Sequence, residues 1–121
     1  MIFFSVPVFG NVIVGPKYRA AFVGNSVQFH CYVEFVHSES MYWYFNSKDI
    51  YYMYLGHETY YEGKTKYSVA RKKQNFTLTV KDLTLDDEGM YKCSNIIEEE
   101  SAKLIVLGEL HLITAEICVN C

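Results

Sequence analysis

The stretch LTLDDEGMYKCSN, residues 83–95, constrains the fold more than any other part of the chain. It places Asp87, Gly89, Tyr91 and Cys93 on every second position. Side chains of an extended chain point to opposite faces with period 2, so all four would lie on one side of a strand. A tyrosine there can return its hydroxyl to the backbone at the corner where the strand begins, while its ring enters a core. The stretch therefore predicts a strand with its approach turn.

Two upstream residues form an ordered set with this strand, namely Cys31 in SVQFHCYVEFV and Trp43 in SMYWYF. The order Cys, Trp and then Asp-x-Gly-x-Tyr-x-Cys resembles an immunoglobulin-superfamily domain, over about residues 11–107. The long interval between Cys31 and Cys93 suggests additional C′ and C″ strands, which is the variable-type plan. The resemblance implies an all-β, immunoglobulin-like β-sandwich of two antiparallel sheets, joined by a Cys31–Cys93 disulfide on which Trp43 packs.

Within that superfamily, YYEGKTKYSV and FTLTVKDLTLDDEGMYKC resemble butyrophilins and the costimulatory ligands related to them. The usual Gly-Arg-Thr of these proteins is Gly63-Lys64-Thr65 here. In the family this arginine pairs with the aspartate of the strand motif, so the resemblance implies an ion pair between Lys64 and Asp87. A lysine offers a point charge where an arginine offers a two-pronged fork, so the pair would be weaker here.

Alternation also indicates which residues face outward on the sheet that the resemblance assigns to five strands. These are C (residues 41–45), C′ (50–55), C″ (within 58–70), F (89–95) and G (102–107). Variable-type domains of this superfamily commonly bind partners through that face. A bulge in the C′ strand would exchange Tyr52 for Tyr51 and Met53. Tyrosine buries much area at low entropic cost, which is typical of a binding patch, but these rings can also pack only on one another across strands. The residues expected on the face are Tyr42, Tyr44, Tyr52, Tyr54, Lys92 and Ser94.

The compartment depends on the state of the cysteines. In an oxidising space a Cys31–Cys93 bond would stabilise the fold by about 2–4 kcal/mol. The alternative is a reduced intracellular immunoglobulin module of the muscle-protein kind, in which a buried cysteine acts as a small hydrophobic residue. Asn75-Phe76-Thr77 is a glycosylation acceptor with Asn75 facing outward at the start of a strand, which favours an extracellular or cell-surface location, or secretion.

Several classes of function are disfavoured. The net charge of −3 argues against nucleic-acid binding, which needs a clustered basic face. No nucleophile motif is present, and Glu98-Glu99-Glu100 is expected to be a solvated hairpin tip, so we expect no enzyme activity and no cofactor. Cys118-x-x-Cys121 lacks the second ligand pair of a zinc site, so no metal is expected.

The two ends of the chain leave alternatives open. Residues 1–10 can be the remnant of a signal peptide or an N-terminal extension. Residues 108–121 can be a linker, a stalk or the start of a following domain, and no run of ~20 apolar residues marks a membrane span. Cys118 and Cys121 can be free thiols, or can form an interchain disulfide.

Three functions remain at this stage. The first is the extracellular domain of a cell-surface receptor or ligand that binds another protein, expected to be a cell-surface immunoglobulin-superfamily protein or a second copy of the chain. The second is a secreted or virus-encoded decoy with the same fold. The third is an intracellular structural module. The sequence does not separate the first two.

Overall fold

The computed structural model describes residues 13–34 and 40–108. The described residues form strands and one short 3-10 helix, as the alternating pattern predicts. The elements are β1 (Ile13–Val14), β2 (Arg19–Phe22), β3 (Val27–Val33), β4 (Ser40–Phe45), β5 (Lys48–Tyr54), β6 (His57–Tyr60), β7 (Tyr67–Lys72), β8 (Asn75–Val80), η2 (Leu85–Asp87), β9 (Gly89–Ser94) and β10 (Glu99–Leu107).

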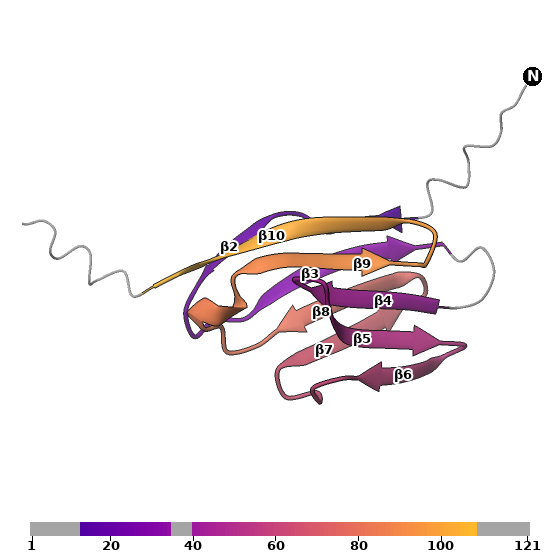
Figure 1. Cartoon of the computed structure of the whole chain (residues 1–121), viewed down its shortest axis with the longest axis horizontal. Helices are drawn as coiled ribbons and strands as arrows, with labels where there is room; N and C mark the ends of the chain where they lie inside the picture. Colours follow the sequence, from indigo (N-terminus) through magenta and orange to yellow (C-terminus); the bar gives the residue numbers. More distant parts are fainter. Residues whose placement is uncertain (1–12, 35–39, 109–121) are drawn as a thin grey trace, which may run out of the picture.

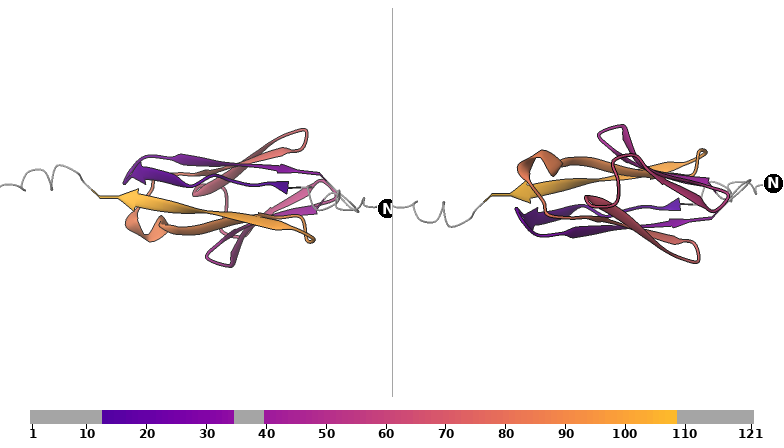
Figure 2. Two further views of the ribbon diagram at one scale, coloured as in Figure 1. Left: turned by 90° about the horizontal axis from the view of Figure 1, so that it is seen from above. Right: turned by 90° about the horizontal axis from the view of Figure 1, so that it is seen from below.

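The strands form two sheets packed face to face, and this confirms the predicted sandwich (Figure 1). One sheet has the order β1-β3-β8-β7 and the other the order β2-β10-β9-β4-β5-β6. The two layers are separate when the molecule is seen from above or below (Figure 2). All strand pairs among the described residues are antiparallel except β2 with β10, which is parallel. The prediction of two antiparallel sheets is therefore wrong for this one pair of the six-stranded sheet.

A break after β1 moves the chain from one sheet to the other. Gly15 and Pro16 lie between β1, which pairs with β3, and β2, which pairs with β10. Proline cannot donate to a ladder, so it is tolerated at such a break. The first strand therefore contributes an edge to both sheets.

The core lies between the sheets and is made by alternate residues of each strand. Along β3 the burial pattern alternates strictly, with four buried residues among three that are not. The buried positions of β8 and β10 follow the same period. The fully enclosed side chains include Phe29, Trp43, Phe76, Leu78, Tyr91 and Leu104.

A bulge in the β4–β5 ladder determines which tyrosines face outward. The register shifts between Trp43 and Tyr44, and the facing strand passes from Tyr51 to Asp49, which leaves Ile50 as an extra residue. Ile50 and Tyr51 are therefore both buried, although they are neighbours. Because the bulge precedes Tyr51, residues 52 and 54 keep the outward parity that the sequence predicts.

Candidate functional site

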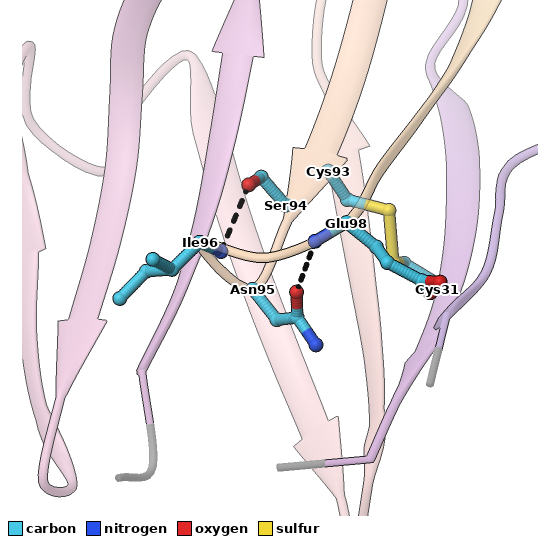
Figure 3. Close-up of a disulfide and its surroundings, with 6 residues drawn as sticks. All are labelled: Cys31, Cys93, Ser94, Asn95, Ile96 and Glu98. Atoms are coloured by element: carbon cyan, nitrogen blue, oxygen red, sulfur yellow. Dashed lines mark hydrogen bonds between the residues drawn. A yellow bond between two sulfur atoms is a disulfide. The ribbon is translucent and has the colours of Figure 1, made fainter. Parts of the chain in front are cut away.

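The disulfide and the tryptophan form the centre of the sandwich. Cys31 on β3 and Cys93 on β9 are bonded across the two sheets (Figure 3). Trp43 lies opposite Cys93 in the β4–β9 register and is inaccessible to solvent. These contacts confirm the predicted bond and the placement of Trp43 beside it. They also fix the position of β4 and β9, which carry the candidate binding face.

The base of β9 is built as the tyrosine pattern predicts. The Tyr91 hydroxyl donates to the carbonyl oxygen of Asp87 at 2.7 Å inside the core. Burial raises the pKa of Tyr91, because a phenolate there would lose its hydration. The Asp87 carboxylate in turn accepts from the backbone N–H of Thr84 at 2.8 Å and closes a capping box over η2.

The cation that pairs with Asp87 is Lys66, and the predicted partner, Lys64, is wrong. The Lys66 ammonium lies 2.6 Å from the Asp87 carboxylate and also donates to the carbonyl oxygens of Lys81 and Asp82. Lys64 instead places its ammonium 5.1 Å from the centre of the Tyr60 ring. It precedes Lys66 by two residues in the turn before β7, and its side chain is directed to Tyr60 of β6 instead of to η2.

Gly89 has a steric role at the start of β9. The amide of Asn46, in the turn between β4 and β5, accepts a hydrogen bond from Met90 N–H at 2.8 Å. A Cβ added at Gly89 would come within 2.4 Å of that same amide. Only glycine lets the β4–β5 turn approach β9 this closely, which explains why the strand motif carries a glycine here.

Four tyrosines form a continuous row on the outer face of the six-stranded sheet. Tyr42 stacks on Tyr52 of the neighbouring strand with ring centres 4.6 Å apart. The ring centres of Tyr44 and Tyr42 are 5.8 Å apart, and those of Tyr54 and Tyr52 are 6.3 Å apart. Burial of Tyr42 and its hydrogen bond with Tyr52 raise the pKa of Tyr42 to about 12. We call these four residues the tyrosine row; its members contact one another and still leave Tyr54 47% exposed.

A charged pair lies at one end of the tyrosine row. The Lys92 ammonium is 5.0 Å from the centre of the Tyr44 ring and 3.0 Å from the Glu99 carboxylate. Burial, and next the negative charges of Asp49 and Glu99, raise the pKa of Tyr44. One cation is therefore held over the end of the row, against the face of the Tyr44 ring.

Exposed apolar side chains extend the same face toward its other edge. Phe22 lies opposite Leu107 in the β2–β10 pairing, and both are 40% exposed. Ile105 and Met90 are exposed to a similar degree on the neighbouring outward positions. The outer face of the six-stranded sheet thus combines aromatic and aliphatic surface, which is typical of protein contact regions.

Ser94 does not belong to this face, in contrast to the prediction. It is 7% exposed, and its hydroxyl accepts a hydrogen bond from Ile96 N–H at 3.1 Å (Figure 3). Asn95 is equally buried, and its amide oxygen accepts from Ile97 and Glu98 N–H. The two polar side chains thus hold the turn between β9 and β10 from within.

That turn presents two isoleucines in an unusual conformation. Ile96 has φ of 87°, a left-handed conformation that a β-branched residue rarely adopts. Ile96 and Ile97 are 64% and 52% exposed, and the Ile96 side chain points away from the hairpin (Figure 3). The hydrogen bonds at Ser94 and Asn95 hold this strained turn, so the tip presents a fixed apolar surface next to the glutamates of β10.

The turn between β7 and β8 lies at the same end of the sandwich as the turn between β9 and β10 (Figure 1). The β7–β8 turn contacts the end of β3 through Val33 N–H and the Gln74 carbonyl. Arg71 on β7 lies over the Phe76 ring and donates to the Lys73 carbonyl. It also donates to the Met53 sulfur of β5 at 3.8 Å, so the arginine is held between its own hairpin and the other sheet.

Residues 14–107 match the family described as the immunoglobulin V-set domain. The chain belongs to the immunoglobulin V-set family. Its strand order includes β6 next to β5 at the edge of the larger sheet, the additional strand that distinguishes variable-type from constant-type domains. No curated protein sequence matches this V-set chain.

Solved structures similar to the V-set chain include immunoglobulin domains of titin. Domain I81 of titin has a TM-score of 0.60 at 19% sequence identity, covering 80% of this chain and 98% of that one. A protein domain described as IG27 has a TM-score of 0.62 at 13% identity, covering 80% and 97%. The titin I-band fragment I67–I69 has a TM-score of 0.59 at 24% identity, covering 79% and 32%. These similarities show the fold of the V-set chain.

The glycosylation acceptor lies on the other sheet. Asn75 is the first residue of β8 and is exposed on the outer face, as predicted. Beside it is a hollow of about 260 Å³. The alternation that the sequence displays does not reveal this hollow, since a depression on a sheet depends on how far neighbouring side chains reach. Ile96 was missed for a related reason, because backbone strain in a turn has no periodic pattern.

Some predicted residues fall outside the described part of the chain. Cys118, Cys121 and residues 1–10 lie there, as do residues 109–121 of the predicted linker. Within residues 13–34 and 40–108, no helix is long and apolar enough to cross a membrane. In the same ranges, no three His, Cys, Asp or Glu side chains gather where they could hold a metal ion.

Proposed function

We propose that the chain is the extracellular, protein-binding V-set domain of a cell-surface receptor or ligand. Its partner is another protein, an immunoglobulin-superfamily protein on a facing cell or a second copy of the chain. The observation that carries the proposal is the tyrosine row on the outer face of the six-stranded sheet, with Lys92 held over Tyr44.

Stacking orders the tyrosine side chains of this face in the free chain, before a partner binds. Each tyrosine ring is already restrained by a neighbour, so association orders few additional side-chain torsions. Tyrosine offers a hydroxyl for hydrogen bonds to a partner, while its ring supplies apolar area. Lys92, held over Tyr44, belongs to the binding face, whereas the glutamates at residues 98–100 lie at its rim, where charges chiefly tune the association rate.

The resemblance to butyrophilins and costimulatory ligands supports a role in cell-cell recognition of the immune type. The disulfide and the exposed Asn75 acceptor support the oxidising, extracellular location. The domain acts by presenting a surface and has no catalytic activity. A secreted or virus-encoded decoy would use the same face, and the part of the gene that follows residue 121 distinguishes the two.

The test is a comparison of matched variants. The secreted chain, made tetrameric, is incubated with cells that each display one immunoglobulin-superfamily ectodomain, and the equilibrium affinity for the ectodomain found is then measured at two salt concentrations. Tyr44→Ala should weaken binding by about 2 kcal/mol, the loss typical of a central aromatic contact. Gln28→Ala, on the outer face of the other sheet, is the control and should keep full affinity.

Two results would contradict the proposal. The first is full affinity of folded Tyr44→Ala and Lys92→Ala chains. The second is loss of binding only when Glu98, Glu99 and Glu100 are neutralised, which would assign recognition to the hairpin rim. Sedimentation of the wild-type chain and of Tyr44→Ala tests the homodimer, because an interface through the tyrosine row would dissociate in the variant.

A further inference from the structure

The outer face of the four-stranded sheet has a shallow hollow beside the glycosylation acceptor. Its volume is about 260 Å³, and its walls include Asn75, Tyr32, His30 and Arg19. Pockets that hold drug-sized ligands measure roughly 300–1,000 Å³. The hollow is therefore smaller than a typical ligand site, and it has the acceptor asparagine as one of its walls.

We propose that this hollow seats the first N-acetylglucosamine of a glycan attached to Asn75. The inference rests on the extracellular location in the proposed function, because N-glycans are added in the secretory pathway. A lipid-linked pyrophosphate oligosaccharide supplies the sugar. The Asn75 amide nitrogen forms a bond to the anomeric carbon, the bond from that carbon to the pyrophosphate oxygen breaks, and the amide loses one proton.

The register places an aromatic ring directly beside the attachment point. Tyr32 on β3 is the cross-strand partner of Asn75 on β8. Directly opposed residues in an antiparallel pair have their Cβ atoms about 4.5–5.5 Å apart. A sugar bonded to Asn75 therefore begins within contact distance of the Tyr32 ring, whose apolar face suits the C–H groups of a pyranose.

The walls of the hollow are held in place by their own hydrogen bonds. The Tyr32 hydroxyl donates to the Gln74 side-chain oxygen at 2.8 Å, which restrains the ring. His30 and Thr77 are hydrogen-bonded to each other at 3.0 Å on the next pair of positions. The Arg19 side chain can donate to sugar hydroxyls or to the acetamido oxygen. A pre-formed wall of this kind reduces the entropy lost when the sugar docks.

The covalent bond to Asn75 favours the glycan over any free ligand as the occupant of the hollow. Any free ligand would compete with a group that is covalently linked to the rim and thus present at high effective concentration. Occupation by the glycan would cover the polar face of the four-stranded sheet. It would leave the tyrosine row, on the other side of the sandwich, as the open protein-binding face.

The test compares the melting temperatures of defined forms of the secreted chain. Endoglycosidase trimming leaves one N-acetylglucosamine on Asn75, and the Asn75→Gln chain carries none. We expect the one-sugar form to melt about 4 °C higher than Asn75→Gln, a shift that a modest contact gives in a domain of this size. In a Tyr32→Leu background the difference should fall to about 1 °C, whereas Tyr61→Leu, an exposed tyrosine elsewhere, should keep it.

Each other result overturns the inference. It is wrong if mass spectrometry finds no glycan on Asn75 of the secreted chain, or if the Tyr32→Leu background keeps the full difference. Should Tyr32→Leu fail to fold, the one-sugar form of the wild type decides, since no increase over Asn75→Gln excludes a seated sugar. The proposed function is tested separately, because Tyr44→Ala binding can be measured on the Asn75→Gln chain.

Discussion

The outer faces of the two sheets differ, although their inner faces are built alike. On the four-stranded sheet the outward pairs are polar, such as Gln28 opposite Thr79 and His30 opposite Thr77. On the six-stranded sheet the corresponding pair is Tyr42 opposite Tyr52. Both sheets supply the same kinds of buried side chain to the core, so the fold does not require this difference. The outward residues are therefore where a function would be expected.

The two outer faces also differ in how far their side chains are exposed to water. Tyr42 and Tyr52 stack on each other and shield each other from water, and this burial raises the pKa of Tyr42 to about 12 although Tyr42 is at an outward position. The polar face has no comparable stack among its described residues. A partner that covers the tyrosine row would bury aromatic rings, whereas one that covers the polar face would have to replace the hydrogen bonds of that face to solvent.

The largest effect is expected from a substitution in the core, which would destabilise both sheets together. Trp43 belongs to the core that the two sheets share, so Trp43→Ala should lower the free energy of unfolding by about 3–5 kcal/mol. Trp43→Phe is the matched control and should cost less, because the indole N–H makes no hydrogen bond in the structure and a phenyl ring fills part of the space. Urea unfolding measures both. An unchanged midpoint in Trp43→Ala would contradict the placement of Trp43 at the centre.

The next effect tests the link between the sheets at their base. Lys66, just before β7, reaches Asp87, just before β9, and so connects the polar sheet to the aromatic one. Lys66→Met leaves the buried Asp87 carboxylate without its cation and should cost about 1–3 kcal/mol, discounted for the partial exposure of Lys66. Lys64→Met should stay within about 0.5 kcal/mol. Equal losses in the two variants, measured by thermal unfolding, would reject the assignment.

Much of this architecture could be predicted from the sequence, for a physical reason. Strict alternation determines the side of each residue, so the buried positions of β3, β8 and β10 follow from their order alone. The prediction of Lys64 rests on the resemblance of Gly63-Lys64-Thr65 to the family's Gly-Arg-Thr. Strand parity does not apply in the turn before β7, and only the folded turn shows that Lys66 reaches Asp87. The error at Ser94 has another cause, because its outward direction is correct but the folded hairpin covers it.

The position of the bulge likewise depends on tertiary contacts. The sequence allowed either parity in β5, and the buried pair Ile50 and Tyr51 decides it. The conformation of the β9–β10 turn could not be predicted either. It depends on hydrogen bonds from Ser94 and Asn95 that form only when the turn is closed.

The smallest expected effect compares one hairpin from each sheet. Ile96 at the β9–β10 turn and Lys73 at the β7–β8 turn both have positive φ, 87° and 57°. Glycine relieves such strain at some cost in chain entropy. Because a β-branched side chain tolerates this region least, Ile96→Gly should raise the free energy of unfolding by about 1 kcal/mol, and Lys73→Gly by only a few tenths of that.

The two glycine variants should differ again in binding. We expect Ile96→Gly to be more stable and yet to bind the partner more weakly, since it loses an exposed apolar side chain at the hairpin of the six-stranded sheet. Lys73→Gly should keep full affinity, because its hairpin belongs to the polar sheet. Chemical unfolding and equilibrium affinity on the same preparations give both quantities. A stabilised Ile96→Gly chain with unchanged affinity would confine recognition to the sheet face, and a destabilised one would mean that the turn conformation is not strained.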